Sequence, residues 1–314
     1  MENIRAVNEF LLLGLTGDHN LQPVIFMIFL FLYLMNLFGN GAIIVIVISE
    51  PRLHSPMYFF LGNLSCLDIC YSSVTLPKLM SNLLSTRKAI SFLGCITQLH
   101  FFHFLGGTEA ILLTIMGFDR FVAICYPLRY TVIMNPQVCA QLAAMAWLNS
   151  FFYALLHSVM TARLKFCGSQ KLKYFFCDVK PLLELACGDV RLNQWLVFTV
   201  TCSLAMAACL LTLLSYVYII SFLLLKSRSC SMLHKALSTC ASHFMVVCLF
   251  YGTVGLTYIP PTTANSVIQE RFVAIIHTTA TSVLNPVVYT LRNKEVMLAL
   301  RRVFGRFCLP KHDH

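Results

Sequence analysis

The chain has 314 residues, of which 58% are apolar and 11% are charged, and its formal net charge at pH 7 is +10. A soluble globular domain carries about 25% charged residues, so a soluble protein with a charge-covered surface is excluded. The basic residues lie in short runs between long apolar segments, which favours charge that flanks membrane spans over nucleic-acid binding.

Long apolar segments recur along the chain, and each is long enough to cross ~30 Å of hydrocarbon as a helix. They lie at 24–48, 57–80, 95–118, 138–160, 195–225, 236–259 and 272–291. Polar residues interrupt the second, third and seventh, so composition alone allows six to eight spans. We predict an all-α integral membrane protein, a seven-transmembrane helix bundle in the lipid bilayer.

Seven spans place the two termini on opposite sides of the membrane. Basic residues in the short loops and the tail favour a cytoplasmic carboxyl terminus, so we expect a multi-pass plasma-membrane protein with its amino terminus outside. The predicted parts are an extracellular segment at 1–23, a transmembrane domain at 24–291 with a long extracellular loop at 161–194, and a cytoplasmic tail at 292–314.

Four cysteines should share the outer face: Cys95 at the start of the third span, and Cys167, Cys177 and Cys187 in the long loop. This distribution suits an oxidising compartment and two disulfides. Four cysteines allow three pairings, and their spacing does not choose among them.

Beyond the last span, apolar residues recur at helical spacing among basic ones. The apolar positions are Val296, Leu300, Val303, Phe304 and Phe307. This pattern predicts a short amphipathic carboxyl-terminal helix on the inner leaflet. Cys308 at its end is either palmitoylated or unmodified.

Polar residues within the spans are Asn40, Asp68, Glu109, Asn285 and Tyr289. A charge near mid-bilayer costs at least ~2.5–3.5 kcal/mol, so such residues face the protein interior and have partners. They either hold helices together or form a hydrated cluster that reorganises when helices move. Two close carboxylates do not both ionise without a cation, so one should hold a proton or share a sodium ion.

Asn285 is followed by Pro286, which removes a helical hydrogen bond and kinks the seventh span. Asn285 can satisfy the freed backbone groups locally. The pair indicates a moving part, although prolines are also tolerated in membrane helices without such a role.

Motifs along nearly the whole chain, in the right order, together resemble the olfactory receptors, which are rhodopsin-like G-protein-coupled receptors. They are Gly39-Asn40, 53–61 (LHSPMYFFL), Leu64-Ser65 with Asp68, 116–130 (MGFDRFVAICYPLRY), Ser215-Tyr216, 235–243 (KALSTCASH), 250–253 (FYGT), 285–289 (NPVVY) and 291–293 (LRN). The sixth-span motif is similar to that of the tetrapod-type class.

The resemblance implies an odorant receptor in the cilia of olfactory neurons, without a cofactor or an enzymatic activity. Such a receptor binds small volatile molecules and activates the olfactory stimulatory G protein, which raises cyclic AMP. The resemblance also implies the disulfides Cys95–Cys177 and Cys167–Cys187.

The chain departs from the family pattern at two places. Asn3, Asn8 and Asn20 each lack Ser or Thr two residues later, so no glycosylation sequon lies near the amino terminus. In the third-span motif, Gly117 replaces the usual Ala and Phe121 the usual Tyr, which removes one hydroxyl from the inner surface.

The seventh span has no Lys for a retinal Schiff base, which argues against an opsin. An amine receptor needs a buried acid in the outer half of the third span, but Phe101, Phe102, His103 and Phe104 occupy that region. We therefore expect a mostly apolar site for a neutral ligand.

The family's motif spacing implies which residues face the ligand. They are Phe102, His103, Gly106, Gly107 and Ala110 of the third span, Val200, Thr201 and Leu204 of the fifth, Tyr251, Val254, Gly255 and Tyr258 of the sixth, and Ile275, Thr278 and Thr279 of the seventh. Gly106 and Gly107 either open room for the ligand or let helices pack closely. His103, Tyr258 and Thr278 are the expected hydrogen-bonding groups.

His100 and His103 share a helix face at a spacing known from metal sites, but two histidines alone are a weak signal, and we expect no metal.

Activation should involve a set of residues in the inner half of the bundle. The set is Asp119, Arg120, Tyr216, His243, Asn285, Pro286 and Tyr289. The inner end of the sixth span reads MLHK at 232–235 and has no acid, so Arg120 should pair with Asp119 and meet Tyr216 or the G protein on activation. We also expect the hydroxyl of Tyr251 to link ligand contacts to His243.

A transporter or channel is the alternative class, but no internal repeat is visible. A membrane enzyme is disfavoured because no group of residues has catalytic spacing.

Overall fold

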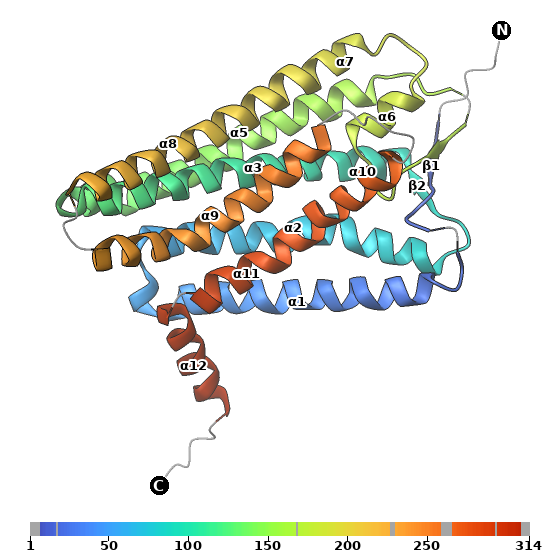
Figure 1. Cartoon of the computed structure of the whole chain (residues 1–314). Coiled ribbons are helices and arrows are strands. Elements are labelled where there is room, and N and C mark those ends of the chain that lie inside the picture. The colour runs from blue at the N-terminus through green and yellow to red at the C-terminus, as the bar shows by residue number, and fades with distance from the viewer. Residues whose placement is uncertain are drawn as a thin grey trace.

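Long apolar helices lie side by side through most of the chain in its computed structural model (Figure 1). The structure describes residues 7–16, 18–167, 169–226, 230–258, 266–292 and 294–308. Within these ranges, the side chains at 230–239, 257–258, 266–270, 280, 291–292, 294 and 304–308 are not described.

Seven helical stretches form the bundle. They are α1 (Gln22–Ser49), α2 (Pro56–Leu84), α3 (Phe92–Cys125), α5 (Pro136–Ala162), the succession α7 (Arg191–Leu196), η3 (Val197–Thr201) and α8 (Cys202–Lys226), α9 (Cys230–Tyr258), and the succession α10 (Ser266–Ile275), η4 (Ile276–Ala280) and α11 (Thr281–Arg292). Among the described residues, six stretches are long and apolar enough to span a membrane, and α9 contributes a shorter apolar segment, Cys240–Leu256. The predicted seven-helix, multi-pass architecture is confirmed.

Polar caps and prolines determine where several helices begin. The Ser91 hydroxyl accepts a 3.1 Å hydrogen bond from the backbone N–H of Gly94 at the start of α3, and Asn135 accepts one of 3.0 Å from Val138 at the start of α5. Helices α1, α2 and α5 have proline in the first turn, where a backbone N–H has no helical partner to lose.

The outward surface of the bundle is apolar. On α1, Phe38 is 74% exposed and Ile48 is 71% exposed, while Leu64, Leu112 and Met116 are fully buried inside. Helices that are apolar both inside and outside suit a lipid environment, because water would leave the outer side chains unfavourably hydrated.

A small sheet covers one end of the bundle, which we call the strand end. Strand β1 (Glu9–Leu12) lies between β2 (Ala89–Ser91), with which it is antiparallel, and β3 (Lys171–Leu172), with which it is parallel. The sequence did not predict these strands, because two to four residues are too few to display an alternating pattern.

Helix α12 (Lys294–Cys308) turns away from the bundle at the opposite end, which we call the α12 end (Figure 1). The Tyr58 hydroxyl donates a 2.8 Å hydrogen bond to Glu295, and the Arg302 guanidinium donates one of 3.1 Å to Glu50. These contacts tie α12 to the corner between α1 and α2, and the predicted amphipathic helix is confirmed. The side chain of Cys308 lies outside the described residues.

Short helices occupy the connections: η1 (Pro51–Leu53) between α1 and α2, η2 (Pro127–Arg129) and α4 (Tyr130–Ile133) between α3 and α5, and α6 (Val179–Leu185) in the long loop. Elements η3 and η4 are π-helical turns within two of the spans. A π turn adds a residue and rotates the side chains beyond it relative to an unbroken α-helix.

Candidate functional site

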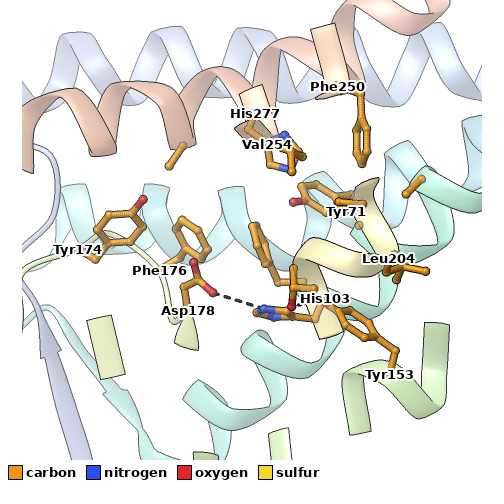
Figure 2. A pocket seen from close by; sticks show the side chains of 17 residues that line it. Tyr71, His103, Tyr153, Tyr174, Phe176, Asp178, Leu204, Phe250, Val254 and His277 are labelled. Atoms are coloured by element: carbon orange, nitrogen blue, oxygen red, sulfur yellow. Dashed lines mark hydrogen bonds and ion pairs between the residues drawn. The ribbon is translucent and has the colours of Figure 1, made fainter. Parts of the chain in front are cut away.

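A cavity of about 90 Å³ lies between the helices and beneath the long loop (Figure 2). Its lining comes from α2, α3, α5, α8, α9, α10, the two π turns and the segment that precedes α6. The lining residues are Tyr71, Phe102, His103, Gly106, Gly107, Ala110, Tyr153, Tyr174, Phe176, Asp178, Thr201, Leu204, Ala205, Phe250, Val254, Ala274 and His277.

Eight of the predicted ligand-facing residues line this cavity. They are Phe102, His103, Gly106, Gly107, Ala110, Thr201, Leu204 and Val254. Their contact with a ligand stays a prediction.

The other predicted positions are not in the lining. These are Val200, Tyr251, Gly255, Ile275, Thr278 and Thr279, whereas the side chain of Tyr258 lies outside the described residues. In the last span the inward positions are Ala274 and His277, one residue before the predicted Ile275 and Thr278. The π turn η4 accounts for this difference, because it changes the side-chain register along the span.

The two adjacent glycines of α3 have different surroundings. A Cβ at Gly106 would lie 3.9 Å from Tyr71, so that side of the helix is open toward the cavity. A Cβ at Gly107 would lie 3.2 Å from the Ser150 hydroxyl and 3.3 Å from Tyr153. Gly106 therefore provides room, whereas Gly107 permits close packing of α3 against α5.

Several lining residues were not predicted from the sequence, and the long loop supplies three of them, Tyr174, Phe176 and Asp178. The structure joins Cys95 to Cys177 and Cys167 to Cys187, the pairs that the resemblance implies. Because the first disulfide holds the loop against α3, the residues beside Cys177 must lie over the bundle. The position of Tyr174, Phe176 and Asp178 close to Cys177 in the sequence was therefore the feature from which they could have been predicted.

One wall of the cavity is polar. His103 Nδ1 lies 3.0 Å from the carbonyl oxygen of Leu99, and His103 Nε2 lies 3.7 Å from a carboxylate oxygen of Asp178. The Tyr153 hydroxyl lies 2.8 Å from that of Thr201. An acid thus enters the site from the loop, although the third span carries none at this depth.

The remaining walls are mainly aromatic. The ring centroids of Phe102 and Phe176 are 4.7 Å apart, and those of Tyr71 and Phe102 are 5.2 Å apart. His277 packs among Tyr71, Phe102 and Phe250, and its Nδ1 lies 2.9 Å from the Thr253 hydroxyl. This lining favours an apolar molecule with a small polar group.

His100 and His103, which have the spacing of metal ligands, have different partners in the structure. His100 Nδ1 lies 3.2 Å from the Ser158 hydroxyl, and His103 faces Leu99 and Asp178. Among the described residues there is no group of three or more His, Cys, Asp or Glu side chains that could hold a metal ion.

The predicted polar core lies deeper in the bundle. The Asn285 amide donates hydrogen bonds of 3.0 and 3.3 Å to Asp68, and the Asn40 amide donates one of 3.1 Å to the backbone carbonyl of Ser282. Asp68 and Glu109 are buried and interact electrostatically, and Oε1 of Glu109 has no hydrogen-bond partner among the described residues. This arrangement leaves a buried oxygen available to a proton or a cation.

The proline of the seventh span packs against α1. A Cβ at Gly39 would lie 3.2 Å from the Pro286 ring, so Gly39 allows the proline of α11 to approach closely. Tyr289, one turn further along α11, is buried, and within the part of the chain that the structure describes its hydroxyl has no hydrogen-bond partner.

Charged and polar residues meet at the α12 end. Arg120 lies 3.5 Å from one oxygen of Asp119, and the Tyr130 hydroxyl donates a 2.8 Å hydrogen bond to the other. Burial and the neighbouring Asp119 raise the pKa of Tyr130 above its ordinary range, so the phenol stays protonated and donates. The expected pairing of Arg120 with Asp119 is present, and Tyr130 is an additional partner.

His243 has partners other than the expected one. Its Nδ1 lies 2.6 Å from the Tyr216 hydroxyl, and its Nε2 lies 3.0 Å from the carbonyl oxygen of Leu113. The Tyr251 hydroxyl instead donates a 3.3 Å hydrogen bond to the carbonyl of Ala110. In this structure Tyr251 therefore joins α9 to α3 beside the cavity and does not contact His243 directly.

The sequence and the fold match known proteins. Residues 29–306 match the family model described as "Olfactory receptor". The chain is 73% identical to human Olfactory receptor 12D3, covering 98% of this chain and 97% of that protein, and 64% identical to human Olfactory receptor 12D1, covering 99% and 97%. Squid rhodopsin superposes with a TM-score of 0.74 at 13% identity, covering 95% of this chain and 90% of that one, which shows a shared fold.

Proposed function

The chain belongs to the olfactory receptor family, and from this premise we propose that it binds small, mostly apolar volatile molecules in its cavity and activates the olfactory stimulatory G protein. Activation of that G protein raises cyclic AMP. Membership in the family makes the chain a multi-pass G-protein-coupled receptor for odorants rather than an enzyme.

The observation that supports this ligand class is the cavity lined mainly by aromatic and aliphatic side chains. Its volume of about 90 Å³ is smaller than the ~150 Å³ of an engineered protein cavity that binds benzene. Larger odorants would therefore require movement of lining side chains, and the two adjoining π turns are where backbone adjustment should occur. A ligand of about ten heavy atoms should bind with micromolar affinity.

We place the strand end outside the cell and the α12 end in the cytoplasm. The two disulfides lie at the strand end and suit an oxidising compartment. The basic residue Arg301 lies exposed on α12, where it would face the anionic inner leaflet. The protein would then lie in the plasma membrane of olfactory cilia.

Transduction in this proposal depends on the α12 end. A ligand acts only by binding the active arrangement more tightly than the resting one. The restraint of Arg120 by Asp119 belongs to the resting arrangement, and its release would expose Arg120 to the G protein. Tyr216 and His243, which join α8 to α9, would separate or rearrange as the helices move.

A cyclic AMP screen with a chemically broad panel of odorants tests the proposal. Cells expressing the full chain should respond to a subset of the panel, whereas Arg120→Ala should reach the surface and give no response. The response should also disappear in cells that lack the stimulatory G protein. A ligand-driven ion or solute flux that persists in those cells would contradict it.

A further inference from the structure

We infer that the cavity recognises a primary amine, whose ammonium group lies between Asp178 and His103 and whose aliphatic tail lies along the aromatic walls. The inference depends on one part of the proposed function, namely that this cavity is the odorant site. It names the head group of the ligand, which the family alone does not.

The hydrogen bond of His103 determines what its second nitrogen can do. A carbonyl oxygen only accepts, so His103 Nδ1, 3.0 Å from the carbonyl of Leu99, carries a proton and donates it. In the neutral tautomer, Nε2 then presents a lone pair. It faces a carboxylate oxygen of Asp178 at 3.7 Å, well beyond the ~2.7–2.9 Å of a charge-assisted hydrogen bond.

When His103 is in this neutral tautomer, two acceptors face each other across the polar wall. An ammonium group has three N–H donors and can donate to the Asp178 carboxylate and to His103 Nε2 at once. An alcohol has one O–H and leaves one of the two acceptors unsatisfied. The geometry thus favours an amine over an alcohol with the same tail.

Asp178 is held in place before any ligand arrives. Its neighbour Cys177 is bonded to Cys95, and the backbone N–H of Cys177 donates a 2.9 Å hydrogen bond to the Gln98 side chain. The Asp178 carboxylate also accepts a 2.7 Å hydrogen bond from the backbone N–H of Val179, which caps α6. The side chain is 17% exposed, so the carboxylate is largely shielded from water and interacts strongly with a cation.

Aromatic rings adjoin the same position. Figure 2 shows Asp178 between Phe176 and His103, with Tyr174 beyond. The centroid of Phe176 is 4.7 Å from that of Phe102 and 5.1 Å from that of Tyr174. A cation within about 6 Å of such ring faces gains further attraction, which an alcohol does not.

The test compares pentylamine with 1-pentanol, which have the same tail and number of heavy atoms. An alkylamine resembles a lysine side chain, with a pKa of about 10.4, so it is an ammonium ion at pH 7. The unfolding temperature of the full-length receptor in nanodiscs, measured against ligand concentration, gives apparent affinities without any G protein. Pentylamine should bind about tenfold more tightly than 1-pentanol.

Asp178→Asn is the informative variant, because an Asn oxygen can still accept the N–H of Val179 and keep the cap of α6. It should weaken pentylamine binding about tenfold and change 1-pentanol binding much less, because the alcohol carries no charge. His103→Phe, which keeps a planar ring but removes Nε2, should also weaken the amine. Asp189→Asn is the matched control, since Asp189 lies in the same loop, is exposed and pairs with Arg191 outside the cavity.

Equal affinities of the two ligands, or full amine binding by folded Asp178→Asn, would overturn the inference. A parallel cyclic AMP assay separates it from the proposed function. Responses to neutral odorants without an amine preference would leave the proposed function standing. If pentylamine binds, Asp178→Asn abolishes that binding and no cyclic AMP response follows, the inference holds. The proposed activation of the stimulatory G protein is then contradicted.

Discussion

The hydroxyl of Tyr130 lies 2.8 Å from Oδ1 of Asp119 and donates a hydrogen bond to it. The other carboxylate oxygen, Oδ2, lies 3.5 Å from the guanidinium of Arg120. The short helix α4 between α3 and α5 is therefore bonded to the same acid that holds Arg120. A movement of that connection would change how strongly Arg120 is restrained.

Loss of this hydrogen bond should raise the activity of the receptor without ligand. We expect Tyr130→Phe to increase basal cyclic AMP severalfold, because a hydrogen bond to a charged group contributes about 1.5–3 kcal/mol. Asp119→Asn should raise it further, since it removes the charge that pairs with Arg120. Basal cyclic AMP is measured per receptor at the cell surface.

Tyr126→Phe is the control for that pair, because Tyr126 lies near the same connection but is 51% exposed. Unchanged basal activity in both Tyr130→Phe and Asp119→Asn, at normal surface levels, would rule out the restraint.

Replacement of Gly106 and of Gly107 in α3 by a larger residue should have different effects. Gly106→Val places methyl groups toward the cavity without a backbone clash, so potency should fall at least tenfold for larger odorants while the unfolding temperature stays unchanged. Gly107→Val should instead destabilise the receptor by about 1–3 kcal/mol, because its side chain meets Ser150 and Tyr153. Dose–response curves and thermal unfolding distinguish the two, and a drop in stability for both variants would contradict the assignment.

Tyr251 should contribute to signalling through its contact with α3. Tyr251→Phe removes the hydrogen bond to Ala110, which is one of the cavity-lining residues. Since such a bond contributes about 0.5–1.5 kcal/mol, the concentration for half-maximal cyclic AMP should rise about two- to tenfold. Tyr218→Phe, on the exposed face of α8, provides the control. Equal potency and amplitude in the two variants would exclude this role.

The buried carboxylates should make the receptor sensitive to sodium. Replacing sodium chloride with potassium chloride should lower the unfolding temperature of the receptor in nanodiscs, because sodium at ten times its dissociation constant stabilises by about 1.4 kcal/mol. Glu109→Gln should remove the difference, since Glu109 supplies a carboxylate oxygen that has no partner among the described residues. Identical unfolding temperatures of the unaltered receptor in both salts would show that the site holds a proton instead.

The helices could be predicted from the sequence because lipid requires long apolar segments with internally satisfied backbone groups. The side-chain register within them could not be predicted everywhere. The family's motif spacing implies that Thr278 faces the ligand, but His277, within the π turn η4, lines the cavity instead. A π turn depends on tertiary packing and leaves no simple compositional pattern.

The loop contribution to the site was missed for a different reason. Asp178 and Phe176 belong to a segment whose path depends on the Cys95–Cys177 disulfide and on contacts with Gln98. The resemblance implies the pairing of Cys95 with Cys177, but the predicted ligand-facing residues were taken from the spans alone, which omits this segment. An apolar site was expected because the third span carries no acid at this depth, whereas the long loop supplies the partly buried Asp178.

The sheet at the strand end also determines at what point of synthesis the amino-terminal segment can fold. Strand β1 leaves the ribosome before its partners, and its partner β3 lies in the connection that follows α5. Four membrane helices must be made before both neighbours of β1 exist. Until then the apolar side chains of Phe10 and Leu12, which are almost fully buried in the finished fold, remain incompletely covered. The amino-terminal segment is thus dependent on later parts of the chain, and a nascent receptor stalled before residue 172 would present it to the quality-control machinery of the membrane in which it is made.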